Sequence, residues 1–405
     1  MTKVVIWGTG KFASCTIKDV LLDKCNLIGF VDNDIQKQNT LWNNKFHIYS
    51  LEKALELSPD YYLVSAMYGR QSIISQAKEF GIKDRLIWYW KDDLDKYDFI
   101  KNNSYLKENI LLKMQIEKMQ RQINNASFEY GKKIVKIKSS RELLEKILTE
   151  KCSLCRFGDG EFDIMLNHER AWFQKCNAQM GERLKEVLNS SLSNIIIAIA
   201  DNYGNLDKYT DGAADAIRKY MTKEKRKEHM ELLDISREYY DAYVSRPYMM
   251  YKNKDENAKL VFGLYKSILS NRNILIVEGK STRNGWNNNL FSSVKSIRRI
   301  LCPDSDSFDY YNEILQTVMC HVNENDLVLI SLGPTATILA YDLAREGIQA
   351  IDFGQMDNEY EWYNMHAMEH VIIPGKSVSE ILWYKTPKKD IHDEEYLKQI
   401  VAIVE

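Results

Sequence analysis

Residues 152–161 read C-S-L-C-R-F-G-D-G-E and join a short apolar run to two glycines that alternate with two carboxylates. The apolar run predicts a buried strand, and the glycines permit a tight loop directly after it. In extended backbone, residues two apart project to the same side, so Asp159 and Glu161 are predicted to present oxygens to one Mg²⁺ or Mn²⁺ ion. In the alternative interpretation, Asp159 caps a helix over residues 162–166 and Glu161 complements its dipole.

Similar apolar runs recur along residues 133–385, separated by segments of helical character such as Thr335–Glu346. The predicted strands are Leu154–Phe157, Ile195–Ala200, Ile274–Glu278, Ile297–Cys302, Leu327–Ser331 and Ala350–Phe353. This alternation predicts an α/β domain with a parallel sheet and helices on both faces. Because ligands bind beyond the carboxyl ends of such strands, the loops that follow them form the candidate site.

The sequence pattern of residues 1–98 predicts a smaller Rossmann-like module with a parallel sheet. The segment begins with a strand, which is followed by the turn Gly8-Thr-Gly-Lys-Phe-Ala13 and by a helical stretch to about residue 22. A second strand comes next and ends at Asp32. This layout is typical of turns that hold a diphosphate and a ribose hydroxyl. The module has about four predicted strands, whereas a full dinucleotide fold has six. Two interpretations stay open: the module binds NAD through Gly8, Gly10 and Asp32, or the glycines only shape the turn.

Residues 102–130 predict one long polar helix, because they contain no proline and no glycine. Leu112, Ile116, Met119 and Ile123 follow one another at spacings of four, three and four, which is the pattern of a helix-packing seam. The seam is short for a coiled coil. Packing on a neighbouring domain and formation of a homo-oligomer through this helix therefore both stay open.

The composition is that of an ordinary globular protein. The 405 residues carry a formal net charge of -2 and a pI of about 6.4, so no nucleic-acid partner is expected. The sequence begins in a strand pattern without an apolar leader, no apolar run reaches transmembrane length, and seven cysteines are scattered along it. We therefore expect a cytoplasmic protein with reduced thiols. The predicted parts are a Rossmann-like module (1–98), a helical linker (99–132), the larger α/β domain (133–385) and a tail (386–405).

Cationic and amide side chains gather in the loop Gly279–Leu290, which follows a predicted strand. Lys280 offers a point charge, Arg283 a bidentate fork and Asn288 an amide donor, a combination suited to a diphosphate or sugar. The alternative is a solvated polar loop without a ligand.

Two further positions are candidates for anion binding. Arg246 is predicted to pair either with a phosphate or with one of the acids of the chain. Thr335 lies in a Gly-Pro-Thr start of a helix, where free backbone N–H groups meet an anion or where the strand and helix simply pack tightly.

The segment 352–362 is acidic and aromatic and follows another predicted strand. A carboxylate in such a place can deprotonate a sugar hydroxyl, and the alternative is an acidic helix start. The candidate catalytic acids are Asp352, Asp357, Glu359 and Glu361.

Five separated motifs occur in order along residues 140–375. They are R-F-G-D-G-E at 156–161, S-R-P-Y at 245–248, N-I-L-I-V-E-G-K at 273–280, S-L-G-P-T-A-T at 331–337 and Q-A-I-D-F-G at 349–354. In this order they resemble the bacterial GT-D-type glycosyltransferase family, formerly a domain of unknown function. Gln355 departs from the family pattern, in which we expect a histidine.

The resemblance implies a second Rossmann-like domain, at residues 133–385, that acts as a glycosyltransferase. It also implies Mn²⁺ or Mg²⁺ on an Asp-x-Glu motif, here Asp159 and Glu161, and a UDP-sugar donor. The nucleotide-sugar ligands are then expected to be Arg156, Arg246, Lys280, Arg283, Asn288 and Thr335. The acceptor is expected to be a glycan or glycoprotein in bacterial surface glycoprotein or polysaccharide synthesis.

Two alternatives to this function stay open. One is an NAD-dependent nucleotide-sugar oxidoreductase or epimerase that uses the N-terminal glycine turn. The other is a non-catalytic partner that brings a glycosyltransferase to its substrate through the 102–130 helix.

Overall fold

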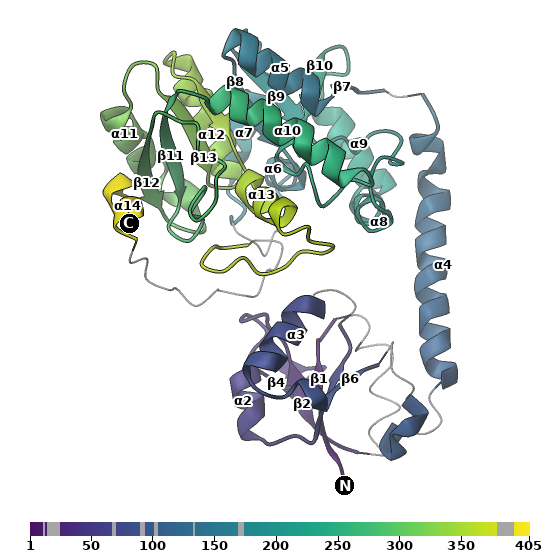
Figure 1. The fold of residues 1–405 in the computed structure, drawn as a ribbon. Helices are drawn as coiled ribbons and strands as arrows, with labels where there is room; N and C mark the ends of the chain where they lie inside the picture. The colour runs from purple at the N-terminus through teal and green to yellow at the C-terminus, as the bar shows by residue number, and fades with distance from the viewer. Residues whose placement is uncertain are drawn as a thin grey trace. The chain divides into compact units, whose positions relative to one another are not determined.

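The computed structural model describes residues 1–10, 13, 25–66, 70–89, 94–100, 104–132, 134–168, 174–378 and 393–405. Contacts between residues divide the chain into two compact units, built mainly from 1–120 and from 121–368 with the C-terminal segment. The helical stretch expected after the N-terminal glycine turn falls mostly on residues outside these ranges. Each unit has its own sheet (Figure 1).

The first unit contains a six-stranded mixed sheet in the order β3-β4-β2-β1-β5-β6. Its elements are β1 (Lys3–Trp7), β2 (Asn26–Val31), β3 (Leu41–Trp42), β4 (Phe46–Tyr49), α2 (Leu51–Glu56), β5 (Tyr61–Val64), α3 (Arg70–Glu79) and β6 (Leu86–Trp88). Both faces are apolar, because Val4 and Ile6 of β1 enter one buried cluster whereas Val5 and Trp7 enter another.

The four parallel strands expected in this unit are confirmed as β1, β2, β5 and β6, and β3 and β4 add an antiparallel hairpin that was not expected. Asn43 and Asn44 form its turn with positive φ angles of 48° and 56°, which asparagine adopts more readily than most residues. Trp42 then stacks on Phe30 at a ring distance of 4.4 Å. The hairpin is therefore stabilised by its turn, by the contacts of Trp42 and Phe46 with Phe30, and by the pairing of β4 with β2, rather than by a long apolar strand.

The second unit contains a nine-stranded sheet in the order β15-β12-β11-β13-β14-β8-β9-β10-β7, and each of its strand pairs is parallel. Its strands are β7 (Lys136–Lys138), β8 (Ser153–Phe157), β9 (Ile195–Ile199), β10 (Glu238–Asp241), β11 (Asn273–Gly279), β12 (Ser296–Cys302), β13 (Leu327–Ser331), β14 (Ala350–Asp352) and β15 (Ile400–Ile403). The six predicted strands are confirmed to within a residue or two. The tail, in which no strand was expected, supplies β15.

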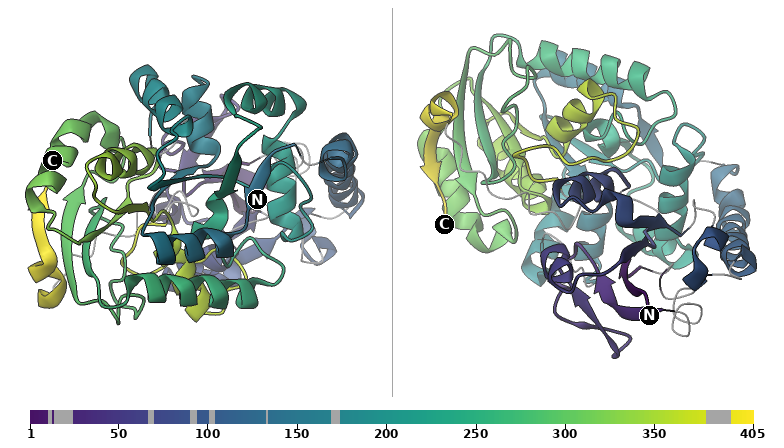
Figure 2. Two further views of the ribbon diagram at one scale, coloured as in Figure 1. Left: turned by 90° about the horizontal axis from the view of Figure 1, so that it is seen from above. Right: turned by 60° about the horizontal axis from the view of Figure 1, so that its bottom comes forward.

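Helices cover both faces of this sheet, as expected for alternating strands and helices. They are α5 (Ser140–Glu150), α6 (Asp159–Met165), α7 (Ala178–Leu188), α8 (Asp211–Tyr220), α9 (Lys223–Leu232), α10 (Lys254–Leu269), α11 (Tyr311–His321), α12 (Pro334–Arg345), α13 (Met356–Asn364) and α14 (Glu394–Gln399). The views in Figures 1 and 2 show α5 with α10 on one face and α7 with α12 on the other.

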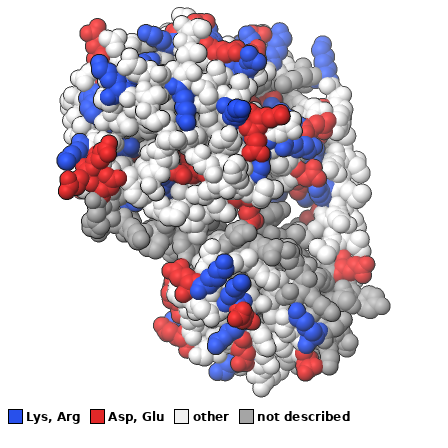
Figure 3. Space-filling view, in the orientation of Figure 1, with Lys and Arg blue, Asp and Glu red and all other residues white. Residues whose placement is uncertain are grey.

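The predicted long helix is confirmed as α4 (Ser104–Glu129), which Figure 1 shows as one continuous helix. No helix of the described residues combines the length and the apolar character needed to cross a membrane. Among the side chains described on the face in Figure 3, basic and acidic groups are interspersed rather than gathered by sign.

Candidate functional site

The site is expected between two neighbouring parallel strands after which the chain continues toward opposite edges of the sheet. After β8 the next strand of the sheet is β9 on one side, whereas after β14 the next is β15 at the far edge on the other side. β8 and β14 are neighbours, and Leu154 lies opposite Ile351. Ligands of open α/β sheets bind at such a switch point, beyond the carboxyl ends of the strands.

An ion pair between a partly buried arginine and a buried aspartate joins the carboxyl ends of these two strands. Arg156 of β8 donates from Nη2 to Oδ1 of Asp352 at 2.6 Å and from Nε to its backbone oxygen at 2.9 Å. Nη1 donates to Oγ of Ser245 at 2.6 Å. Gly354 leaves room for the guanidinium, because a Cβ at this position would lie 2.1 Å from Nη2. Burial raises the pKa of Asp352, and the Arg156 charge opposes that rise.

The loop after β8 is the first turn of α6 and is not extended. Gly158 is the N-cap residue, and its N–H donates to Oε2 of Glu161 at 2.7 Å. Asp159 is the exposed first residue of the helix, and its Oδ1 accepts from the N–H of Gly160 at 3.0 Å. The prediction of extended backbone is therefore wrong. The alternative of a helix at this place is confirmed, but its N-cap residue is Gly158 and not Asp159 as expected. In a helix, residues two apart do not share a face, so metal binding by Asp159 and Glu161 stays a prediction without that geometric argument.

A tyrosine hydroxyl lies beside the start of α6. The Tyr220 hydroxyl lies 3.3 Å from the carbonyl oxygen of Asp159. Burial raises the pKa of Tyr243, the positive charge of Arg246 lowers it, and the negative charge of Asp159 raises it further. Arg246 follows β10 and the short 3-10 helix Ala242–Ser245, so it lies beyond the carboxyl end of a strand of the same parallel sheet as β8.

Glu359 of α13 holds the loop that carries Arg246. Its Oε2 accepts hydrogen bonds from the backbone N–H groups of Tyr248 and Met249, at 2.8 and 2.9 Å. The carboxylate is fully buried. Its position fixes the S-R-P-Y segment relative to α13, and the catalytic role predicted for Glu359 stays a prediction.

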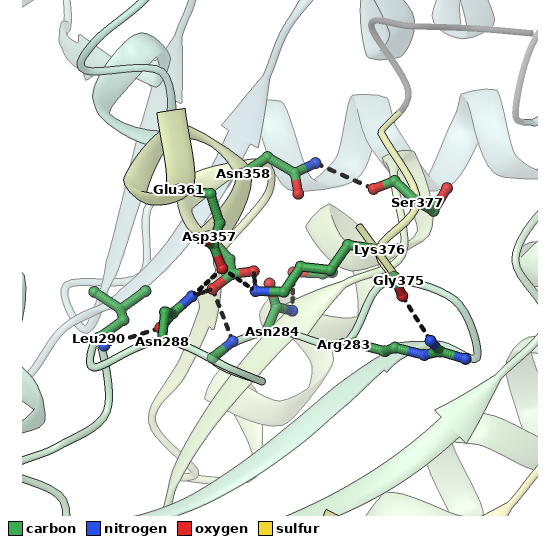
Figure 4. Close-up of polar contacts among 12 residues, drawn as sticks. Arg283, Asn284, Asn288, Leu290, Asp357, Asn358, Glu361, Gly375, Lys376 and Ser377 are labelled. Carbon is green, nitrogen blue, oxygen red and sulfur yellow. Dashed lines mark hydrogen bonds and ion pairs between the residues drawn. The ribbon is translucent and has the colours of Figure 1, made fainter. Parts of the chain in front are cut away.

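A second group of predicted residues forms a network around a buried lysine (Figure 4). Lys376 donates from Nζ to Oδ2 of Asp357 at 2.6 Å and to Oε1 of Glu361 at 2.7 Å. Asn288 donates from Nδ2 to both acids at 2.8 Å. Arg283 donates from Nη1 to the carbonyl oxygen of Gly375, next to the lysine, at 2.6 Å. The structure thus joins the 279–290 loop to α13 through these side chains.

The remaining predicted ligands are engaged elsewhere. Lys280 follows β11, and its Nζ lies 2.7 Å from Oε1 of Glu405. Thr335 is fully buried near the start of α12, and its hydroxyl contacts Oε1 of Gln174 at 3.4 Å. Gln355, in place of the expected histidine, is the N-cap residue of α13. Roles of Lys280 and Thr335 in donor binding stay predictions.

The carboxylate of Asp32 accepts hydrogen bonds from residues of the N-terminal unit itself. Oδ2 of Asp32 accepts from the backbone N–H of Thr9 at 3.0 Å and from its hydroxyl, while Oδ1 accepts from the N–H of Asp34 at 3.0 Å. These contacts stabilise the turn, and nucleotide binding there stays a prediction.

A metal ion at the start of α6 would depend on few protein ligands. Within the described residues, the structure contains no cluster of three or more His, Cys, Asp or Glu side chains arranged to bind a metal. Mg²⁺ is commonly held by one or two carboxylates together with substrate phosphates and water. The exposed carboxylate of Asp159, with Glu161 behind it, fits that mode of binding.

Three residues of these networks were not predicted as site residues from the sequence. Ser245 and Tyr243 follow β10, whose sequence Glu-Tyr-Tyr-Asp has no apolar run to predict a strand. Lys376 lies in a Pro-Gly-Lys-Ser turn, where nothing local distinguishes it from a solvated lysine. The neighbouring S-R-P-Y motif was the one available signal for Ser245.

The stability of the protein should depend on the protonation of Glu161. Burial, and then the Asp352 carboxylate, raise the pKa of Glu161 to about 7. Between about pH 4.5 and pH 7, the folded chain holds this proton and the unfolded chain does not, so stability falls as the pH rises through that window. We expect this carboxyl to remove up to about 3 kcal/mol of unfolding free energy across the window.

Urea unfolding at pH 5 and pH 7.5 tests this expectation in the native protein and in Glu161→Gln. Glutamine keeps an oxygen for the Gly158 N–H but has no titrating proton. The native protein should therefore lose more stability than the variant as the pH rises. Equal losses in both proteins would contradict the assignment.

Comparisons with known proteins identify both parts of the chain. Residues 154–381 match the family described as glycosyltransferase GT-D fold, and residues 1–88 match the family described as C2185-like, N-terminal. The glycosyltransferase GlyD of Streptococcus pneumoniae serotype 4 is 32% identical over 292 residues, which are 70% of this chain and 34% of that protein. The probable glycosyl transferase Gly of Streptococcus gordonii is 32% identical over 275 residues, which are 66% of this chain and 39% of that protein. The match thus spans little more than a third of these curated relatives.

Solved structures agree with this assignment. The domain of unknown function 1792, described as a distinct glycosyltransferase fold, is 33% identical with a TM-score of 0.63 and covers 67% of this chain and 96% of its own. A glycosyltransferase with the same domain from Streptococcus sanguinis is 30% identical with a TM-score of 0.63. The match covers 67% of this chain and 100% of that chain. These matches confirm the resemblance seen in the five motifs. The chain therefore belongs to the glycosyltransferase GT-D fold family.

Proposed function

We propose that this chain transfers a sugar from a UDP-sugar to a glycan or glycoprotein acceptor in the synthesis of a bacterial surface glycoprotein or polysaccharide. Membership of the GT-D family supports the reaction class. The observation that carries the proposed site is the exposed carboxylate of Asp159 at the start of α6, directly after β8 and beside the switch point. The donor, the acceptor and the metal are parts of the proposal.

The proposal places Mg²⁺ or Mn²⁺ on Asp159 with help from Glu161. Such an ion, when bound, neutralises charge on the diphosphate that leaves from the sugar. Arg246, which lies beyond the carboxyl end of β10 in the same sheet, contributes a positive charge. Negative charge grows on the leaving diphosphate as the sugar bond breaks, so a cation held in place before the reaction lowers the barrier.

The acceptor hydroxyl must lose its proton during transfer. Among the four predicted acids, Asp352 lies at the junction of β8 and β14, whereas Asp357 and Glu361 share the Lys376 network. Burial also raises the pKa of Asp352, which makes it a better proton acceptor than a solvated aspartate. The proposal therefore assigns acceptor activation to Asp352.

Release of UDP tests the proposal directly. Purified protein is incubated with a panel of UDP-sugars and Mn²⁺, with and without candidate glycan acceptors, and UDP is measured. Asp159→Asn is expected to reduce metal-dependent release by at least ~100-fold, because one of few charged ligands is lost. Asp211→Asn is the matched control, since Asp211 is also an exposed first residue of a helix.

Two outcomes would contradict the proposal. Full metal-dependent activity of a folded Asp159→Asn protein would remove the metal assignment. Inertness of the native protein toward every nucleotide sugar, together with tight binding to a partner transferase, would favour a non-catalytic role. Saturable binding of NAD(H), followed by nicotinamide fluorescence, would support the oxidoreductase alternative instead.

A further inference from the structure

Helix α4 carries a heptad seam longer than the four apolar residues that first mark it. The seam consists of Asn109, Leu112, Ile116, Met119, Ile123 and Ala126, and it continues to Tyr130, which directly follows the last residue of the helix. Its members follow one another at alternating spacings of three and four residues over three heptads. An α-helix places such residues along one stripe of its surface.

This seam faces solvent. Ile116, Met119 and Ile123 are 62%, 60% and 68% exposed, and Leu112 and Tyr130 are 47% and 67% exposed. Large apolar side chains are seldom aligned in one exposed stripe on a monomer, and such a stripe indicates an interaction surface.

Other faces of α4 are covered by the chain itself. In the first half of the helix, Ile110 and Met114 pack into the apolar cluster of the N-terminal unit. In the second half, Asn125 is buried and accepts from Nη2 of Arg226 at 2.8 Å. Glu129 forms a buried bidentate pair with Arg218, with distances of 2.6 and 2.8 Å. Each half of the helix thus packs against its own unit through residues outside the seam, and the large apolar residues of the seam stay exposed.

The chemistry of the seam fits a second copy of the same helix. In heptad terms, Ile116 and Ile123 occupy a positions, and Leu112 and Met119 occupy d positions. A β-branched residue at a with leucine at d favours two parallel strands. Asn109 occupies another a position, where a single polar residue specifies the register and the number of strands.

Charges beside the seam agree with the parallel orientation. In a parallel pair, a g residue faces the e residue of the next heptad in the partner helix. Glu108 would face Lys113 of the second copy, and symmetry repeats this attractive pair. The other pairs of this kind are Gln115 with Gln120 and Gln122 with Ser127, which carry no charge. No like charges meet, and Lys113 is the single cation at these e and g positions, whereas helices that bind anionic membranes are rich in lysine and arginine.

We propose that the chain is a parallel homodimer in which the α4 seam packs against the same seam of a second copy. The proposal does not depend on the reaction that the second unit performs. Because the interface uses one helix from each copy, its strength is predicted to reside in the four central apolar residues.

Analytical ultracentrifugation of the full chain tests the dimer. The native protein should sediment as a dimer at micromolar concentration, and the double variant Ile116→Lys with Ile123→Lys should raise the dissociation constant by at least ~100-fold. The matched control is Leu148→Lys with Leu260→Lys, which changes two helical leucines that are 43% and 40% exposed but lie outside the seam. Circular dichroism and thermal unfolding establish that both variants are folded.

A charge exchange tests the orientation. Lys113→Glu should weaken the dimer by about three- to tenfold, and adding Glu108→Lys should restore it. In an antiparallel pair, g faces g and e faces e, so the second change would not restore binding. A monomeric native protein, a dimer indifferent to the isoleucine changes, or failure of this restoration would overturn the proposal. So would recruitment of monomers to anionic lipid vesicles through the same isoleucines.

Discussion

An Arg156→Met variant is expected to lose about 3–5 kcal/mol of unfolding free energy and at least ~100-fold of the proposed transfer activity. Methionine retains much of the side-chain volume but leaves the carboxylate of Asp352 buried without its cation, which is 2.6 Å away in the native protein. The hydrogen bond to Ser245 is also lost. Since the pair joins the carboxyl ends of β8 and β14, its loss should displace the groups on both sides of the switch point.

Two comparisons separate the stability effect from the activity effect. Arg141→Met removes an arginine whose side chain is 63% exposed and should change stability by less than about 1 kcal/mol. Arg156→Met combined with Asp352→Asn removes both charges, so it should recover part of the stability but little activity. Chemical denaturation and UDP release measure the two quantities. A native-like stability of Arg156→Met would contradict the prediction.

A Lys376→Met variant is expected to lose about 3–5 kcal/mol of unfolding free energy, because it leaves two buried carboxylates without their shared cation. Lys376 is 1% exposed and contacts Asp357 and Glu361 at 2.6 and 2.7 Å. Asn288 donates to the same carboxylates, so the 279–290 loop should loosen when they separate. Thermal and urea unfolding measure the loss, and limited proteolysis of the loop reports the loosening.

Neutralising the two acids tests whether charge is the cause. Adding Asp357→Asn and Glu361→Gln to Lys376→Met should recover a large part of the lost stability, because no unpaired charge then remains buried. Lys398→Met serves as the control, since Lys398 is 77% exposed and pairs with Glu394, which is 85% exposed. If the triple variant were as unstable as the single one, the loss would arise from packing and the charge argument would fail.

The central strands could be predicted because burial on both faces demands a continuous apolar run. Ile195–Ile199 and Leu327–Ser331 are fully buried, and both were found from composition alone. The strands β7 and β10 were missed because they are short and carry polar residues. They pair through backbone hydrogen bonds, which leave no trace in the side-chain pattern. β15 was missed because its apolar residues directly continue a helix.

The strand ends that carry the candidate site could be predicted, but the contacts between their side chains could not. Strand ends and motifs correctly placed Arg156 and Asp352 at one edge of the sheet, yet their pairing spans 196 positions and has no local signal. The backbone at Asp159 was predicted wrongly, because a hydrogen bond from Gly158 to Glu161 turns the chain into a helix directly after the strand. Spacing alone could not distinguish that turn from an extended loop.

The neighbouring position of β8 and β14 has a consequence for biosynthesis. Arg156 leaves the ribosome 196 residues before Asp352. At bacterial and eukaryotic rates of about 5–20 residues per second, this interval lasts roughly 10–40 s. Until then one edge of the most apolar part of the sheet lacks its permanent neighbour and is open to wrong pairing. Nascent chains of this protein should therefore rely on chaperones, and slower translation between these two strands would lengthen the vulnerable interval.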